Sequence, residues 1–363
     1  MSKLLKSLEQ RISVEGDEYL RAELQAKRAA YFARIGAFDE ARSEIASVRS
    51  LFGDGRSGRV TVLLMVAEGL LLHFESLGAG ALDRILRAQM LAQAGRDQEL
   101  IALASAWRAY LEFERSDFES AARSLGIASS TAADDDRAAR SRISAVLFTA
   151  FALSGDLPTA QRYFHLGREH AIQEGDQAGL DALLHNKAVF TAAHLRAANC
   201  IEIIPQESLA LARTEVNSAR NLQQLTRVKS LAAYIDLADA RLAILEAKHA
   251  YALERLEQLQ GAGPFPSGHF GPALGVIEQA YCLGRLGKVE EAVARLKGAS
   301  ESDLSSFDPD DRLVAAWQLR ALSKMDERFG ATSVREAELV NARSAYLQMT
   351  DRAKQAFAPF SGA

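Results

Sequence analysis

The stretch SGDLPTAQRYFHLG, residues 154–167, decides the fold. It places an acidic residue directly after Gly155, then Ala160, and then Phe164 four residues further on. Glycine tolerates the tight turn between two antiparallel helices, and Asp156 can cap the second helix through its side-chain oxygen. Ala160 and Phe164 then share one face of that helix. The stretch therefore predicts the turn and the second helix of a helical hairpin.

The same spacing recurs along the chain. A small residue is followed by an apolar residue two positions later, an alanine three positions after that, and an apolar residue four further on; His249 replaces the first apolar residue in one copy. The copies begin at Gly36, Ser116, Gly155, Ala247 and Gly287. The intervals of 80, 39, 92 and 40 residues predict a period near 40, with degenerate copies near 76–80 and 195–199. Such a period is typical of solenoid proteins.

Composition agrees with a helical fold. The chain of 363 residues is rich in Ala, Leu, Arg and Glu, which favour helix, and alternating Val/Ile/Thr runs are nearly absent. We predict an all-α chain of about eight antiparallel helix pairs, forming a single unit over residues 1–363 with a flexible break at 261–268 and a frayed tail at 358–363. The first helices of the pairs are expected at roughly 18–35, 58–76, 97–114, 134–154, 177–197, 222–246, 270–286 and 309–329.

The repeated residues resemble tetratricopeptide repeats. The stretches FALSGDLPTAQRYFHLG (151–167) and YCLGRLGKVEEAVARLKGA (281–299) match that family's pattern of turn glycine, alanine and following apolar residue. The continuation EGDQAGLDALLHNKAVF (174–190) is similar to the longer-helix variety found in bacterial sensor and regulator proteins. The resemblance implies a right-handed superhelical solenoid whose first helices line the concave face. A flat helical bundle without superhelical twist is the structural alternative.

Residues with the spacing needed for catalysis or metal binding do not appear. The seven histidines form no HExxH motif, and neither a P-loop nor a GxSxG motif occurs. Cys200 and Cys282 are in no metal-ligand spacing. We therefore expect no enzyme, no cofactor and no bound metal, and rank an enzyme with a dispersed site last.

Net charge and hydropathy limit the kinds of partner expected for the chain. The net charge of −4 argues against a nucleic-acid-binding protein. The N-terminal residues contain no apolar core of signal-peptide length. The most apolar stretch, VTVLLMVAEGLLLHF (60–74), is too short to span a bilayer and contains Glu68 and His73. We predict a cytoplasmic protein that binds neither nucleic acid nor membrane.

The resemblance also implies which side chains face the groove of the superhelix. Counting back from the turns gives Arg34, Tyr110, Arg142, Tyr234, Arg241, Tyr281 and Arg285, and Asn186 and Arg196 in a further unit. Arginine grips a carboxylate with two hydrogen bonds, and tyrosine adds contact area and a hydroxyl. The set predicts a groove for a protein or peptide partner with an acidic segment. The alternative is that these arginines are solvated or paired with nearby Glu and Asp.

Two function classes follow from this reading. The first is a non-catalytic scaffold or adaptor that binds a protein or peptide on the concave face. The second is a ligand- or peptide-sensing regulatory protein of a bacterial signalling or transcription system, which changes its superhelical pitch on binding. The helix expected at 335–357 carries an apolar stripe that packs on the preceding pair or on a second copy of the chain. A homo-oligomer through terminal helices is therefore possible.

Overall fold

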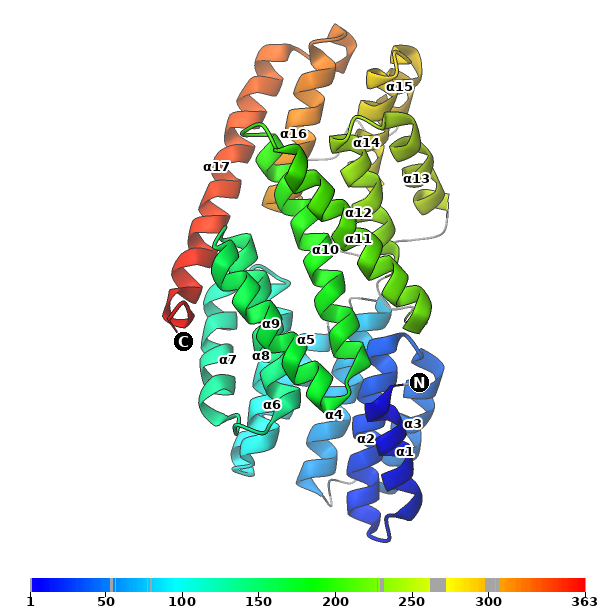
Figure 1. Ribbon diagram of the computed structural model, residues 1–363, viewed down its shortest axis with the longest axis vertical. Helices are drawn as coiled ribbons and strands as arrows, with labels where there is room; N and C mark the ends of the chain where they lie inside the picture. The colour runs from blue at the N-terminus through cyan, green and yellow to red at the C-terminus, as the bar shows by residue number, and fades with distance from the viewer. Residues whose placement is uncertain are drawn as a thin grey trace. The chain divides into compact units, whose positions relative to one another are not determined.

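The computed structural model describes residues 2–52, 55, 57–76, 78, 80–226, 228, 232–261, 272–297, 304 and 307–362 (Figure 1). Over these residues it contains 17 α-helices and no strand, with short 3-10 turns that include Glu327–Phe329 and Ala358–Phe360. The prediction of an all-α chain is confirmed for this part of the chain. No helix in it is long and apolar enough to cross a membrane.

The helices divide between two compact units. Unit 1 comprises Met1–Leu184, Asn221–Leu231 and Arg352–Ala363, and unit 2 comprises His185–Arg220 and Ala232–Asp351. In chain order the helices are α1 (Lys3–Val14), α2 (Glu18–Ile35), α3 (Phe38–Phe52), α4 (Gly58–Ser76), α5 (Gly80–Ala94), α6 (Gln98–Phe113), α7 (Phe118–Thr131), α8 (Arg137–Leu153), α9 (Leu157–Glu174), α10 (Gln177–Asn199), α11 (Gln206–Thr226), α12 (Ala232–Leu245), α13 (His249–Gly261), α14 (Pro272–Arg285), α15 (Val289–Lys297), α16 (Pro309–Ser323) and α17 (Thr332–Phe357).

Unit 1 is built from helices that pack on their neighbours in sequence. Helix α2 packs on α3, α4 on α5, α6 on α7 and α8 on α9, and the first helices of these pairs also contact one another, α2 with α4, α4 with α6 and α6 with α8. Alanines let the backbones approach closely. A core cluster of α2, α3 and α4 contains Ala22, Ala29, Ile45, Val48, Phe52, Val60, Leu64 and Ala67. This packing is the pattern expected of helical repeats.

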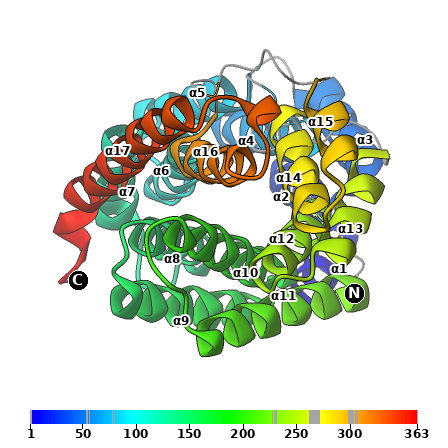
Figure 2. The same ribbon diagram turned by 90° about the horizontal axis from the view of Figure 1, so that it is seen from above.

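Unit 2 continues the same kind of packing. Helix α12 packs on α13, α13 on α14, and α14 on both α15 and α16 (Figure 2). Its core again mixes small and large apolar residues. One cluster contains Leu237, Ala240, Ala243, Ala252, Leu256, Leu259 and Cys282.

All five predicted turn residues adopt the left-handed conformation. The φ angles are 80° at Gly36, 57° at Ser116, 79° at Gly155, 59° at Ala247 and 77° at Gly287. Each residue lies between the first and second helix of a pair, as the spacing predicts. The predicted helix cap is also confirmed, because the Thr159 amide donates to Asp156 Oδ1 at 3.2 Å. All five turns therefore use a residue that tolerates positive φ, and at Ser116 and Gly155 the next residue is an acid that caps the second helix.

Most predicted first helices correspond to observed ones. Those at 18–35 and 58–76 coincide with α2 and α4, and those at 97–114, 134–154, 177–197, 270–286 and 309–329 correspond to α6, α8, α10, α14 and α16. The prediction at 222–246 is wrong in its first part, because α11 runs to Thr226 and α12 begins at Ala232. The degenerate copy expected at 195–199 lies within the end of α10 rather than at a turn. Beyond Gly261, the break predicted at 261–268 lies outside the described residues.

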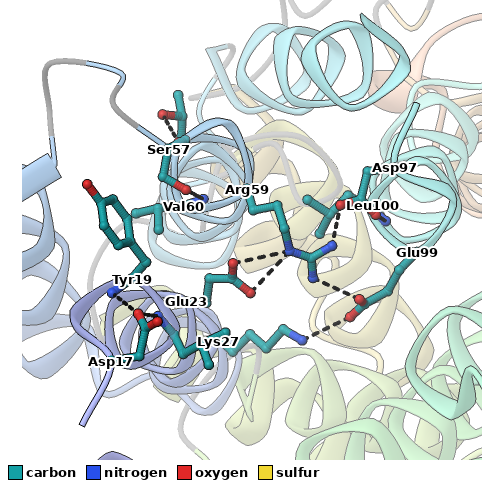
Figure 3. A network of polar contacts seen from close by, with 12 residues as sticks. Asp17, Tyr19, Glu23, Lys27, Ser57, Arg59, Val60, Asp97, Glu99 and Leu100 are labelled. Carbon is teal, nitrogen blue, oxygen red and sulfur yellow. Dashed lines mark hydrogen bonds and ion pairs between the residues drawn. The ribbon is translucent and has the colours of Figure 1, made fainter. Parts of the chain in front are cut away.

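One guanidinium ties three first helices of unit 1 together (Figure 3). Arg59 of α4 donates to Glu23 of α2 at 3.1 Å, to Glu99 of α6 at 2.8 Å, and to Asp97. Lys27 of α2 donates to the same Glu99 at 2.9 Å. Burial alone would lower the pKa of Arg59, but the hydrogen bond to Glu99 and the surrounding carboxylates outweigh burial and raise it. The network therefore links α2, α4 and α6 through their side chains.

The end of the chain returns to unit 1. The Phe357 ring is almost fully buried, and its centroid lies 6.0 Å from that of Phe113 and 6.4 Å from that of Phe118. Residues 358–363, expected to fray, include the 3-10 turn Ala358–Phe360. The Tyr163 hydroxyl of α9 donates to the Phe360 carbonyl at 2.7 Å. This segment is thus bonded to unit 1.

We predict opposite stability changes at two equivalent turns. Ser116→Gly should raise the free energy of unfolding by about 1 kcal/mol, because glycine adopts positive φ without the strain of a Cβ atom. Gly155→Ala should lower it by about 1–2 kcal/mol through strain alone, since a Cβ there meets no atom within 4 Å. Urea unfolding followed by circular dichroism measures both. A loss of stability in Ser116→Gly would contradict the assignment of strain to this turn.

Candidate binding sites

Three of the predicted groove residues come together in unit 1. The guanidinium carbon of Arg142, on α8, lies 3.7 Å from the centroid of the Trp107 ring and 5.4 Å from that of Tyr110, both on α6. The guanidinium carbon of Arg34, on α2, lies 5.7 Å from the same Trp107 centroid. We call Arg34, Trp107, Tyr110, Arg142 and their acidic neighbour Asp176 the Arg142 cluster. Trp107 was not among the predicted groove residues, although its spacing of three residues from Tyr110 places both on one face of α6.

The positive charge of the Arg142 cluster is only partly balanced. Arg34 donates to Asp176 Oδ2 at 2.7 Å, and the other oxygen of Asp176 accepts from the Gly179 amide at 3.0 Å. Arg142 is only 6% exposed, its Nε has no hydrogen-bond partner, and within the described residues its guanidinium makes no ion pair. Burial, followed by the charge of Arg34, lowers the pKa of Arg142 to about 9. Within the described residues Arg34 is therefore paired with the Asp176 carboxylate, and Arg142 is paired with no carboxylate.

Stacking on Trp107 offsets part of the free-energy cost of burying the Arg142 guanidinium without an acid partner. A cation over an aromatic face gains about 2 kcal/mol when both are desolvated, whereas an unpaired buried ion costs several kcal/mol. The rings themselves are held in place: His73 Nε2 lies 3.3 Å from the Tyr110 hydroxyl, and Phe74 packs edge-on to Trp107 with centroids 6.3 Å apart. The cluster is therefore a fixed platform with excess positive charge, suited to an anion that arginine can bind with two hydrogen bonds.

Four other predicted groove residues lie together in unit 2. Arg196, Arg241, Tyr281 and Arg285 all line one cavity of about 150 Å³, which we call the α14 cavity. Tyr234 and Asn186 do not line it. Tyr234 is buried with its ring edge-on to His185, and Asn186 is half-buried on α10.

Two arginines of the α14 cavity, the buried Arg196 and the half-buried Arg241, are paired with acids. Arg196 donates to Glu278 at 2.6 Å and to Asp311 at 3.0 Å, and Arg241 donates to the same Glu278 oxygen at 3.0 Å. Glu278 is fully buried. For these two arginines the structure shows the alternative raised by the sequence, pairing with Glu and Asp. The partners lie 82 and 115 residues from Arg196, so no local sequence pattern identifies them.

Metal ligands and cysteine thiols are the other groups considered for a site. No cluster of His, Cys, Asp or Glu able to hold a metal ion occurs in the described part of the chain. Burial raises the pKa of the Cys200 and Cys282 thiols to about 12, which keeps them protonated and unreactive at neutral pH.

The chain matches no protein-family model and no curated protein. Its function must therefore be argued from its own residues.

Removing the shared acid of the α14 cavity should destabilise the protein. Glu278→Gln leaves Arg196 and Arg241 with less compensating charge in a buried site, so we expect the free energy of unfolding to fall by about 3 kcal/mol. The urea midpoint, followed through Trp317 fluorescence in a Trp107→Phe background, measures the loss. A change within about 0.5 kcal/mol, typical of surface substitutions, would show that the network is solvated.

Removing the unpaired guanidinium of unit 1 should have the opposite effect. Arg142→Met replaces an uncompensated buried cation with an apolar side chain of similar length, and we expect a gain of about 1 kcal/mol. Arg142→Lys keeps the charge and should give no gain. Urea unfolding compares the two variants. A loss in Arg142→Met as large as that in Glu278→Gln would mean that Arg142 is already compensated.

Proposed function

We propose that this chain is a non-catalytic binding protein, and that an acidic group of a protein or peptide partner binds at the Arg142 cluster. The observation that carries the proposal is the burial of Arg142 without an acid partner among the described residues. A partner carboxylate would bring the cluster to two cations and two anions. Hydrogen bonds to charged groups contribute about 1.5–3 kcal/mol each. The contact between the partner carboxylate and Arg142 would therefore supply much of the affinity of a segment whose other contacts are weak.

The proposal includes a finer account of the fold. We infer about eight helix pairs stacked as a right-handed, tetratricopeptide-like solenoid, whose first helices line its concave face. Two observations support this account: the first helices α2, α4, α6 and α8 contact one another in series, and the members of the Arg142 cluster on helices come from α2, α6 and α8. A cytoplasmic location belongs to the same proposal, because Cys200 and Cys282 are free thiols.

Matched peptide pools test the proposed function. One pool carries Glu and Asp at random positions in short unstructured peptides, and the other carries Gln and Asn at the same positions. We expect the acidic pool to bind at least about tenfold more tightly, as one charge-assisted contact of about 1.4 kcal/mol requires. Fluorescence anisotropy of labelled peptides gives the affinities. Trp107 fluorescence in a Trp317→Phe background reports whether binding occurs at unit 1.

Two arginine variants make this experiment specific. Arg142→Met should remove the preference for the acidic pool. Arg87→Met changes the same charge on the exposed surface of α5, where Arg87 pairs only with Asp83, and should keep the preference. Equal binding of the two pools, or an unchanged preference in Arg142→Met, would overturn the proposal.

A further inference from the structure

The α14 cavity contains buried polar atoms that have no hydrogen-bond partner among the described residues, separate from the Arg142 cluster. It lies within unit 2 among the end of α10 and helices α12, α14 and α16, which are labelled in Figure 2. Gln318 of α16 and His249 at the start of α13 both line it. Gln318 is 2% exposed and His249 9% exposed. In the described part of the chain, Gln318 Oε1 and His249 Nδ1 have no hydrogen-bond partner.

Two such atoms in one cavity point to an occupant. More than nine in ten buried polar groups in proteins are hydrogen-bonded, and the exceptions reduce stability. An amide oxygen accepts hydrogen bonds only, and a neutral imidazole nitrogen accepts or donates according to its tautomer. The pKa of His249 is lowered by burial and then by the charge of Arg285, so the ring is neutral at pH 7. An occupant that satisfies Gln318 must carry an N–H or O–H group.

The charge of the cavity favours an anion. Arg196 and Arg241 are balanced by Glu278 and Asp311, two charges of each sign. Arg285 is additional: it is exposed, lines the cavity, and makes no hydrogen bond or ion pair within the described residues. It lies close enough to both rings for its charge to act on them: burial and then the Arg285 charge lower the pKa of His249, while burial raises the pKa of Tyr281 and the Arg285 charge opposes that rise. Arg285 therefore supplies one unpaired positive charge beside a largely buried space.

The size and walls of the cavity set the shape of the occupant. A cavity of about 150 Å³ accommodates a molecule the size of benzene, and drug-sized ligands need roughly 300 Å³ or more. The rings of Tyr281 and Trp317 lie 5.6 Å apart between centroids, and His249 is edge-on to Tyr281 at 5.9 Å. Aromatic walls of this kind favour a flat body.

We propose that the α14 cavity binds a small, flat carboxylic acid of about eight non-hydrogen atoms that carries a hydrogen-bond donor. Its carboxylate pairs with Arg285, its ring lies against Tyr281 and Trp317, and its donor bonds to Gln318. This site is distinct from the Arg142 cluster and goes beyond the proposed function. It assigns to the same chain a second ligand, of metabolite size, that does not depend on partner binding in unit 1.

Three isosteric probes test the proposed chemistry. Pyrrole-2-carboxylate has the flat ring, the charge and the donor; furan-2-carboxylate lacks the donor; pyrrole-2-carboxamide lacks the charge. The chain has two tryptophans, Trp107 and Trp317, so the Trp107→Phe variant reports only on this cavity. We expect a saturable change in Trp317 fluorescence with pyrrole-2-carboxylate, and at least about tenfold weaker binding of the other two probes, as the loss of one matched polar contact predicts.

Two variants of equal charge complete the experiment. Arg285→Gln should weaken pyrrole-2-carboxylate at least about tenfold without lowering the unfolding midpoint, because Arg285 is exposed. Lys288→Gln makes the same charge change outside the cavity lining and should leave binding unchanged. Adding Arg142→Met should also have no effect, which separates this site from the proposed function. No saturable signal, equal binding of the three probes, or equal effects of Arg285→Gln and Lys288→Gln would each overturn the proposal.

Discussion

Reversal of the chain at a single left-handed residue is the constraint on which this structure depends. The turn fixes where one helix ends and the next begins, and at two of the turns a capping acid, Asp117 or Asp156, follows it directly. Because the turns recur in register, the first helices of unit 1 contact one another in series. Side chains far apart in sequence, such as Arg34 and Arg142, therefore meet around one aromatic ring. Where glycine is replaced at such a turn, as at Ser116, the fold accepts backbone strain rather than lose the reversal.

Arginine side chains have two kinds of surroundings in this chain, which differ in the number of acids around each guanidinium group. Arg59 has three carboxylate partners and holds helices together. Arg196 has two and is part of a closed, buried network. Arg142 is equally buried but rests on Trp107, and burial lowers its pKa. A buried cation without a matching anion lowers the free energy of unfolding. Losses of stability of this kind are typical of functional sites.

The sequence predicted the fold better than the sites, for a physical reason. Helices such as α2 and α4 are bounded by turn residues and helical spacing, which are local signals, so their limits were predicted closely. The boundary between α11 and α12 was missed because no turn signal of the repeat falls there. The positions of Arg34, Tyr110 and Arg142 were predicted by counting back from the turns. Whether an arginine is paired with an acid depends on distant residues such as Asp176, which lies 142 residues from Arg34. Their role as a binding surface stays a prediction.

The division of unit 1 among three separate chain segments has a consequence for biosynthesis. A ribosome makes the chain from its N-terminus, so residues Arg352–Ala363 emerge only after all of unit 2 has been made. Until then the aromatic surface of Phe113 and Phe118 lacks the ring of Phe357 that packs on it. Unit 1 is thus the first to begin folding and the last to finish, and a nascent chain carries an uncovered apolar surface for most of its synthesis.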